Sequence, residues 1–248
     1  MSWLIDKNVW LEIYSSIKRE LALSFDLDQL ATDLLSNILS TMSNAIDIKQ
    51  LKKGINSDCA LVFGPAPSIE NDFQKANELS LFNKLPVIAV NGATTFFYEK
   101  GFIPTIIVTD LDGDPNHIAS LNDKGAIVVV HAHGDNIDEI KKWVPKFSGH
   151  LIGSTQVEPR PHVYNFGGFT DGDRALFIVY ALGIRKAIVG GMNFLNSIGK
   201  YSTMYKKKNE GIKRLKMSIA MRLIKMLTLW GMEIKALSDT GIPNIEVI

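Results

Sequence analysis

Ile106 to Pro115 reads Ile-Ile-Val-Thr-Asp-Leu-Asp-Gly-Asp-Pro, and its change from apolar to acidic residues decides both the fold and the place of the chemistry. If Ile106–Thr109 is a buried strand, Asp110, Asp112 and Asp114 follow its carboxyl end, where open α/β sheets bind their ligands. Carboxylates this close repel one another, and a hard cation would hold them together. The alternative is an acidic turn that ends the strand and caps the next helix.

Short apolar runs of the same kind lie on both sides of this stretch, about 20–30 residues apart, with room for a helix between neighbours. They are Cys59–Phe63, Val87–Val90, Ile106–Thr109, Ile127–Val130 and Ala187–Val189, with weaker runs near Leu151, near Val163 and at Glu233–Ala236. Such spacing predicts βαβ units. We therefore expect residues 57–248 to form a Rossmann-like α/β domain, with a mostly parallel sheet and helices on both faces.

Residues 1–56 are expected to form a helical N-terminal module that packs on this domain or on a second subunit. One apolar face would consist of Trp10, Ile13, Ile17 and Leu21, and a second of Leu30, Leu34, Ile38 and Met42. Ser24 or Asp26 would cap the second helix, and Gly54 would end it. Near the other end, Ile212, Leu215, Ile219, Leu223, Met226 and Trp230 predict one long amphipathic helix.

The composition is that of a globular protein with a full core, at 248 residues, 46% hydrophobic and 21% charged. A net charge of +1 gives no reason to expect nucleic acid, and no apolar run approaches the roughly 20 residues that span a bilayer. The single cysteine, Cys59, and the lack of a signal-like N-terminus favour a cytoplasmic protein. Residues 200–225 hold nine basic side chains and one acidic, which suits either a polyanion site or a solvated helix face.

Glycine, asparagine, histidine or aspartate follows almost every predicted strand. The candidates are Gly64, Pro67 and Ser68, then Asn91 and Gly92, then His131, His133, Asp135 and Asn136, then Thr170, Asp171, Asp173 and Arg174, then Gly190, Asn193 and Lys200. The small-residue turn from Gly64 to Ser68 could let backbone N–H groups approach an anion. Each group alone could also be an ordinary turn or helix cap, with Ser68 and Thr170 or Asp171 as N-caps. Their recurrence favours one shared site at the carboxyl edge of the sheet.

Six aspartates are expected at this edge of the sheet, namely Asp110, Asp112, Asp114, Asp135, Asp171 and Asp173. They favour Mg²⁺, which prefers oxygen ligands and usually also binds substrate phosphates. Arg174, Lys200 or the Lys206–Lys208 run would neutralise a polyphosphate such as ATP. Together these features predict phosphoryl or diphosphoryl transfer between small molecules. The chain lacks a P-loop, a dinucleotide fingerprint and a Gly-x-Ser-x-Gly elbow. With Cys59 on another strand, we do not expect a dedicated zinc site.

Four motifs in order carry a family resemblance: Gly64-x-x-Pro67-Ser68, Thr109-Asp-Leu-Asp-Gly113, His131-Ala-His-Gly-Asp-Asn136 and Gly168-Phe-Thr-Asp-Gly-Asp-Arg-Ala175. The chain resembles the archaeal 6-hydroxymethyl-7,8-dihydropterin pyrophosphokinases over roughly residues 58 to 237, and more distantly the thiamine pyrophosphokinases. The resemblance implies transfer of a diphosphate from ATP to the hydroxymethyl group of a reduced pterin, with release of AMP and a requirement for Mg²⁺. It also implies a role in tetrahydromethanopterin or folate-type cofactor synthesis.

On this resemblance Asp110 and Asp112 hold Mg²⁺, whereas Asp171, Asp173 and Arg174 engage the nucleotide phosphates or a second metal. The residues expected to act in catalysis are Asp110, Asp112, His133, Asp135, Asp171 and Arg174. Those expected to bind the substrates are Gly64, Pro67, Ser68, Asn91, Gly92, His131, Asn136, Thr170, Asp173, Gly190, Asn193 and Lys200. Asn193 departs from the family pattern, where an aspartate is expected, so it keeps an oxygen but loses the charge.

Other functions stay open at this point. The acceptor could be another alcohol, such as thiamine, on the same fold. The chain could also be a non-catalytic module that binds a nucleotide or, by similarity of the family to flagellin-modifying proteins, a sugar nucleotide. A homo-oligomer is also left open. Asp114, which Pro115 follows directly, is expected to cap a helix and not to bind the metal.

Overall fold

The computed structural model describes residues 3–55, 57–195, 199–203 and 210–248. In this part of the chain, nine strands pair in parallel in the order β6-β5-β4-β3-β2-β1-β7-β8-β9. The strands are β1 Cys59–Phe63, β2 Val87–Val90, β3 Ile106–Thr109, β4 Ile127–Ala132, β5 Leu151–Thr155, β6 Val163–Tyr164, β7 Lys186–Gly190, β8 Glu233–Ala236 and β9 Glu246–Val247. The predicted fold class and all eight predicted strands are confirmed, and the short edge strand β9 is added.

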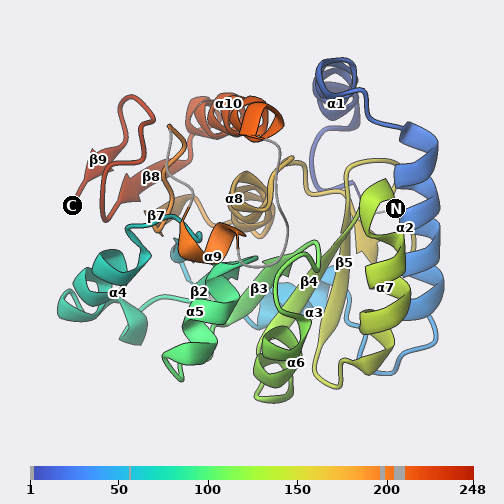
Figure 1. Ribbon diagram of the computed structural model, residues 1–248, viewed down its shortest axis with the longest axis horizontal. Coiled ribbons are helices and arrows are strands. Elements are labelled where there is room, and N and C mark those ends of the chain that lie inside the picture. The colour runs from blue at the N-terminus through green and yellow to red at the C-terminus, as the bar shows by residue number, and fades with distance from the viewer. Residues whose placement is uncertain (1–2, 56, 196–198, 204–209) are drawn as a thin grey trace.

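Helices cover both faces of the sheet (Figure 1). The α-helices are α1 Lys7–Leu21, α2 Phe25–Leu39, α3 Ile48–Lys53, α4 Ile69–Glu78, α5 Ala93–Glu99, α6 Pro115–Asp123, α7 Ile137–Trp143, α8 Asp171–Ala181, α9 Lys200–Thr203 and α10 Glu210–Leu229. Figure 1 shows α8 and α10 on one side of the sheet and α4, α5 and α6 on the other. None of the described helices is both long and apolar enough to cross a membrane.

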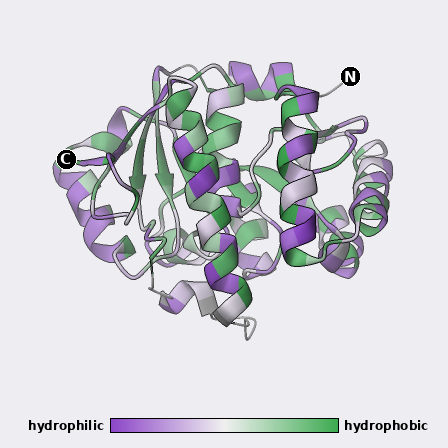
Figure 2. Ribbon diagram, turned by 90° about the horizontal axis from the view of Figure 1, so that it is seen from above, coloured by the Kyte–Doolittle hydropathy of each residue, from purple (hydrophilic) through white to green (hydrophobic). Residues whose placement is uncertain are grey.

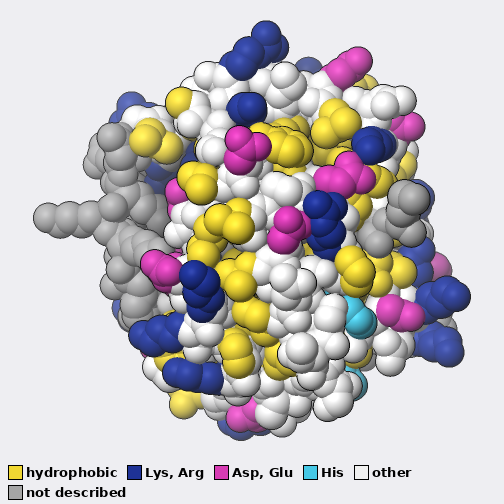
Figure 3. Space-filling view, turned by 90° about the vertical axis from the view of Figure 1, so that its right-hand side faces the viewer, with side chains coloured by type: hydrophobic (Ala, Val, Ile, Leu, Met, Phe, Trp, Pro, Cys, Tyr) yellow, Lys and Arg dark blue, Asp and Glu magenta, His cyan; other side chains and the backbone are white. Residues whose placement is uncertain are grey.

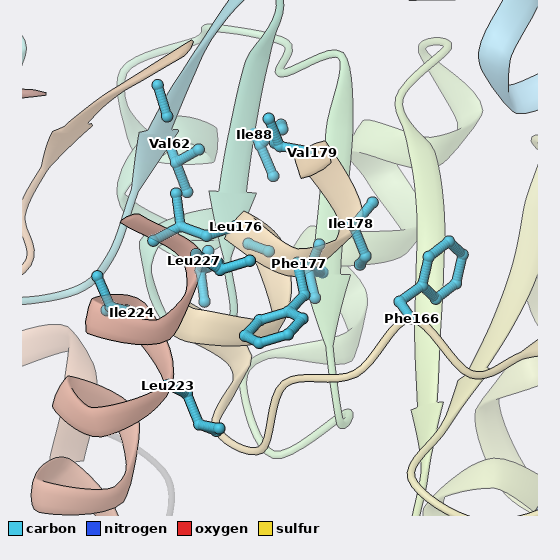
Figure 4. Close-up of a cluster of buried hydrophobic side chains, with 14 of the residues drawn as sticks. Val62, Ile88, Phe166, Leu176, Phe177, Ile178, Val179, Leu223, Ile224 and Leu227 are labelled. Carbon is cyan, nitrogen blue, oxygen red and sulfur yellow. The ribbon is translucent and has the colours of Figure 1, made fainter. Parts of the chain in front are cut away.

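Successive side chains of the central strands point to opposite faces of the sheet. Helices cover both faces, so each of these strands contributes to two cores. In β3, Ile106 and Val108 face the core beneath α8 and α10, whereas Ile107 faces the core beneath α6 and α7. Figure 4 shows the first of these cores, where side chains of β1 and β2 meet those of α8 and α10. Figure 2 shows hydrophilic and hydrophobic residues interleaved along the helices, while the strands behind them are largely hydrophobic.

The N-terminal helices hold the β5–β6 end of the sheet from both sides. Trp10 of α1 belongs to the core beneath α8, and Leu35 of α2 belongs to the core beneath α7. The apolar face predicted for the second helix is partly right, because Leu34, Ile38 and Met42 pack against the core whereas Leu30 is 55% exposed. The fully buried residues of α2 are Ala31, Leu35 and Leu39. Gly54 ends the separate helix α3, while α2 ends at Leu39. On the outer face over α2 and α7, charges of both signs alternate with hydrophobic side chains (Figure 3).

The order of the strands creates a crevice at their carboxyl edge. The chain runs outward from β1 to β6, then crosses back through α8 and inserts β7 on the free side of β1. The loops after β1 and β7 therefore leave the sheet toward opposite faces. Ligands of open α/β sheets bind at such a switch point, and the predicted site residues follow the same strand ends.

Candidate functional site

Three carboxylates meet at one side-chain amide in the centre of the site. Asn91 Nδ2 lies 3.2 Å from Asp110 Oδ1, 2.5 Å from Asp112 Oδ1 and 3.0 Å from Asp171 Oδ2. The three acids come from the loop after β3 and from the first turn of α8, and Asn91 follows β2. The recurrence of polar residues at strand ends therefore does bring together side chains that are far apart in sequence. We call these four residues the acidic centre.

The backbone after β2 and β3 is bent so that these side chains converge. Asn91 has φ +46° and Leu111 has φ +68°. Asparagine adopts this left-handed conformation fairly often, whereas leucine adopts it rarely. Leu111 is held there because its side chain is buried in the core beneath α6 and α7. As a result, Asp110 and Asp112 flank it on the side of the site, where the Asp112 N–H donates to Asp110 Oδ1 at 3.0 Å.

The loop after β4 places His133 beside the acidic centre. The Asp135 N–H donates to His133 Nδ1 at 3.2 Å, which helps to orient the imidazole ring. His133 Nε2 is 3.6 Å from Asp110 Oδ2. Asn136 fixes the loop, since its Nδ2 donates to the carbonyl oxygens of Asp110 and His131 at 2.8 and 2.7 Å.

Arg174 and Asp171 form an ion pair at the start of α8. Arg174 is 1% exposed, and its guanidinium donates to Asp171 Oδ1 at 2.9 Å and to the Phe169 carbonyl oxygen at 2.7 Å. Asp173 points away from the acidic centre and accepts hydrogen bonds from the N–H groups of Phe169 and Thr170. Thr170 is thus the N-cap of α8, within a capping box.

Burial and neighbouring charges shift the pKa values of Asp110 and His131. Burial alone would raise the pKa of Asp110, but the hydrogen bond and charge of His133 and the hydrogen bonds with Asp112 bring it far below its usual range. Burial, helped by the charges of Arg174 and His133, lowers the pKa of His131 well below that of a free histidine. Asp110 is therefore an anion and His131 is neutral at pH 7.

Two of the cavities in the described part of the chain adjoin the acidic centre. The large cavity, of about 570 Å³, extends from the acidic centre past His131, His133 and Arg174 to the turn between α1 and α2. The small cavity, of about 150 Å³, lies at the switch point between β1 and β7. Residues that line both are Asn91, Asp112, Thr170, Asp171, Lys213 and Met217.

The acidic centre suits a divalent cation that is completed by a ligand. Among the described residues, no group of three or more histidine, cysteine, aspartate or glutamate side chains is arranged as a metal site. Mg²⁺ commonly takes only one or two protein carboxylates, together with water and substrate phosphates. Asp110 and Asp112 meet that need, and Asn91 Oδ1 is a buried oxygen beside them with no hydrogen-bond partner among the described residues. The donor set therefore fits Mg²⁺.

The structure distributes the predicted residues unequally. The large cavity alone is lined by Asp110, His131, His133, Asp135, Asn136 and Arg174, the small one alone by Gly64, Gly92 and Asn193, and both by Asn91, Asp112, Thr170 and Asp171. Asp135 is 89% exposed at the rim. Pro67, Ser68, Asp173, Gly190 and Lys200 line neither cavity, and Lys206–Lys208 lie outside the described residues. Ser68 Oγ donates to Asp72 and Lys200 lies over the ring of Tyr201.

The loop after β1 does not offer its amides to an anion, contrary to the sequence expectation. The Gly64 N–H donates to the Gly190 carbonyl oxygen at 2.9 Å and the Ala66 N–H to that of Gly191 at 2.7 Å, while prolines occupy positions 65 and 67. A Cβ at Gly64 would lie 2.8 Å from the Gly191 oxygen. The glycines here let two loops approach each other and do not form a phosphate cradle.

Asn193 has a structural role that an aspartate could fill only in part. Its Oδ1 accepts from the Leu195 N–H at 3.1 Å, and its Nδ2 donates to the Asp239 carbonyl oxygen at 3.1 Å. An aspartate could accept the first hydrogen bond but could not donate the second. The amide at this position therefore ties the loop after β7 to the loop after β8.

Sequence reasoning missed site residues contributed by helices. Asp28 of α2 lines the large cavity, and its Oδ1 accepts from the Gly134 N–H at 2.8 Å. Lys213 and Lys216 of α10 also line this cavity. The excess of basic residues in 200–225 was the available signal for the two lysines, but it could not say which of them face the site.

Proteins of similar sequence point to one family. A sequence model described as 6-hydroxymethylpterin diphosphokinase MptE-like matches residues 32–199. A protein named 6-hydroxymethyl-7,8-dihydropterin pyrophosphokinase from Methanocaldococcus jannaschii is 40% identical over 233 residues, which are 90% of this chain and 96% of that one. A protein of the same name from Methanothermobacter thermautotrophicus is 35% identical over 227 residues, 90% of this chain and 95% of that one.

The fold itself is shared more widely. A Maf glycosyltransferase from Magnetospirillum magneticum superposes with a TM-score of 0.53 at 14% identity, over 78% of this chain and 34% of that one. Identity this low shows a likeness of fold alone. The matches in sequence cover most of the chain and confirm the resemblance carried by the four motifs. The chain belongs to the 6-hydroxymethylpterin diphosphokinase MptE-like family.

Proposed function

We propose that this protein transfers a diphosphoryl group from ATP to the hydroxymethyl group of 6-hydroxymethyl-7,8-dihydropterin, with Mg²⁺ as cofactor and AMP as the second product. The proposal rests on one observation above all: the acidic centre borders two adjoining cavities, which share six of their lining residues. A two-substrate transferase needs such an arrangement, because both substrates must reach the same metal and the same carboxylates. The names of the relatives supply the chemical identity of the acceptor.

The side chains at the site divide the work of such a transfer. Asp110 and Asp112 would hold Mg²⁺, which when bound neutralises phosphate charge. The large cavity is lined by five aspartates and three cationic side chains, a formal balance of −2 that would repel a nucleotide without the metal. Arg174 forms an ion pair with Asp171 and would hold this carboxylate next to the reacting phosphates. His133 Nε2 lies 3.6 Å from Asp110 Oδ2 and would orient that carboxylate. Positioning and charge neutralisation are the main sources of catalysis in phosphoryl transfer.

An assay of the nucleotide product tests the proposal. The purified protein is incubated with ATP, Mg²⁺ and the hydroxymethyl pterin, and the nucleotides are separated by ion-exchange chromatography. We expect AMP and pterin diphosphate in equal amounts, and no turnover in the presence of EDTA. Formation of ADP, or ATP binding without turnover, would contradict the proposal.

Replacing the acceptor determines its chemical class. The same assay with thiamine, or with a sugar nucleotide in place of ATP, separates the proposed reaction from the two alternatives that share its fold. AMP release with thiamine but not with the pterin would assign a different acceptor. We place the reaction in the cytoplasm, where ATP is the common phosphoryl donor.

A further inference from the structure

We propose that the small cavity binds the pterin ring and the large cavity binds the nucleotide. This assignment rests on the proposed function and adds to it the place of each substrate. It reverses the usual expectation for an open α/β sheet, in which the phosphates lie at the switch point against a glycine-rich loop. Three features of the structure carry it.

Among the described residues, the loop after β1 gives the small cavity few free donors for a polyphosphate. The N–H groups of Gly64 and Ala66 are bonded to carbonyl oxygens of the loop after β7, and Pro65 and Pro67 have none. Ser68 Oγ is committed to Asp72 at 2.8 Å. Of the residues that line this cavity, Asp112 and Asp171 are negative and Lys213 is positive. A neutral ligand is therefore favoured over an anion.

The walls of the small cavity fit a flat heteroaromatic ring. Met192, Phe194 and Tyr201 line it and are at most 8% exposed. Tyr201 is fixed from behind, since its hydroxyl donates to Glu99 at 2.7 Å. Ser202 also lines the cavity, and its hydroxyl, which donates to the Pro65 carbonyl oxygen at 3.2 Å, keeps an acceptor oxygen for a polar group of the ring. Apolar walls with a few polar groups are typical of sites for small cofactors.

The large cavity has the size for a nucleotide and, once Mg²⁺ offsets its carboxylates, enough cationic side chains for the phosphates. Its volume of about 570 Å³ is nearly four times the 150 Å³ of the small one. Arg174, Lys213 and Lys216 line it near the acidic centre. His131 Nε2 is buried there without a hydrogen-bond partner among the described residues. At the far end Leu23, Leu27 and Ile212 form an apolar wall that suits an adenine ring.

The two substrates would then meet at Asp112 and Asp171, the carboxylates that border both cavities. The hydroxymethyl oxygen of the pterin forms a bond to the β-phosphorus of ATP. The bond from that phosphorus to the oxygen bridging to the α-phosphorus breaks, and AMP leaves with the electron pair. The hydroxyl proton passes to one of these carboxylates and from there to water.

Gly172 offers a test that keeps the fold intact. It lines the small cavity from the first turn of α8, and a Cβ at this position would meet Met192 Cε at 3.7 Å, an ordinary contact. Gly172→Ala should therefore fold at least as well as the wild type, because alanine is the better helix former. Its methyl group reduces the space for a ring. Gly54→Ala is the matched control, since its Cβ would also meet only ordinary contacts, at the C-cap of α3 away from both cavities.

Dissociation constants are measured by calorimetry for each ligand separately, with the pterin alone and with a non-hydrolysable ATP analogue plus Mg²⁺. We expect Gly172→Ala to weaken pterin binding about tenfold, the effect of overpacking the cavity by one methyl group, with less than a twofold change for the analogue. Lys216→Ala should weaken the analogue and not the pterin. The opposite pattern, or no change for either ligand, would overturn the assignment.

These binding measurements keep the assignment separate from the proposed reaction. If the wild type binds both ligands but releases no AMP, the proposed function fails while the two dissociation constants still decide the assignment. If the wild type binds the analogue but no pterin, both are overturned.

Discussion

The charge of Asp110 is the main feature of the proposed Mg²⁺ site. Its carboxylate stays ionised far below the usual pKa because His133 and Asp112 stabilise the anion against the cost of burial. Asp110→Asn keeps the shape and removes that charge. We expect it to lower Mg²⁺-dependent turnover by at least about 100-fold, the typical cost of losing one electrostatic group at a phosphoryl or acyl transfer site, with little change in the melting temperature.

The matched control is Asp114→Asn in the same loop. Asp114 accepts the Asn116 N–H at 2.9 Å as the N-cap of α6, which confirms the role expected from the Asp-Pro sequence. Asparagine caps as well as aspartate, so turnover and stability should both stay near the wild type. Equal loss of turnover in the two variants would mean that the loop, and not the metal-binding charge, was damaged.

His131 makes the stability of the protein sensitive to mild acid. Burial and the nearby charge of Arg174 lower its pKa in the folded state, whereas an unfolded histidine has a pKa near 6.5. As the pH falls below that value, His131 binds a proton in the unfolded chain but not in the folded protein. The free energy of unfolding should therefore drop by up to about 2 kcal/mol between pH 6.5 and 5 from this residue alone.

Urea unfolding at pH 7.5 and pH 5 measures this effect. His131→Gln should reduce the difference between the two pH values, because the glutamine does not titrate. His150→Gln, at an exposed histidine, should leave the difference unchanged. A pH dependence that is identical in His131→Gln and the wild type would show that other groups cause it.

Among the elements, α2 does more than cover the edge of the sheet. Asp28 Oδ2 accepts from the Tyr14 hydroxyl at 2.5 Å and from Gln156 Nε2 at 2.7 Å, while Oδ1 accepts from the Gly134 N–H. This buried carboxylate of α2 thus connects α1 and the residue that follows β5 to the loop that carries His133. The same contact raises the pKa of Tyr14, after burial as the larger cause.

We expect Asp28→Ala to cost roughly 2–4 kcal/mol of stability, since several buried donors lose a charged acceptor. It should also lower kcat more than it raises KM for either substrate, because Asp28 positions the His133 loop. Asp26→Asn controls for the helix dipole, as Asp26 is an exposed acid in the same first turn of α2. Loss of stability with an unchanged kcat would limit Asp28 to a structural role.

The elements show what local pattern can and cannot predict. The strands follow from short β-branched runs, because a strand buried on both faces needs no polar positions. The buried face of α2 was predicted only in part because it also carries Asp28, Thr32 and Ser36, whose polar atoms find hydrogen-bond partners. A prediction from hydrophobic periodicity assigns such polar residues to the solvent-facing side of a helix. Hydrogen bonds to distant loops, which decide the matter, leave no local signal.

At the scale of the whole molecule, the site was predictable where topology is simple. Parallel strands end at one edge, so Asn91, Asp110 and His133 could be assigned to one site from the sequence. Lys213, Lys216 and Asp28 could not, because α10 and α2 reach the cavity only through the packing of the complete fold. The loop after β1 looked like an anion cradle, but its amides are bonded to a loop more than 100 residues away, which no local motif reveals.

That packing also predicts that residues 57–248 cannot fold alone, although the sequence pattern separates them from a helical module. Residues 1–56 contribute Trp10, Leu35, Leu39 and Leu51 to the cores beneath the sheet, each 0% exposed. Without them, β4 and β5 would lose their cover near α2, and each large side chain removed from a core typically costs 2–5 kcal/mol. Four such losses sum to about 8–20 kcal/mol, against the 5–15 kcal/mol that stabilises a typical domain.

The fragment 57–248 should therefore show no cooperative unfolding transition by circular dichroism. Co-expression with residues 1–56 as a separate chain should restore the transition and AMP release together, because the same helices bring Asp28 to the His133 loop. A fragment that unfolds cooperatively on its own, but lacks activity, would instead make the N-terminal helices an independent module that completes the site.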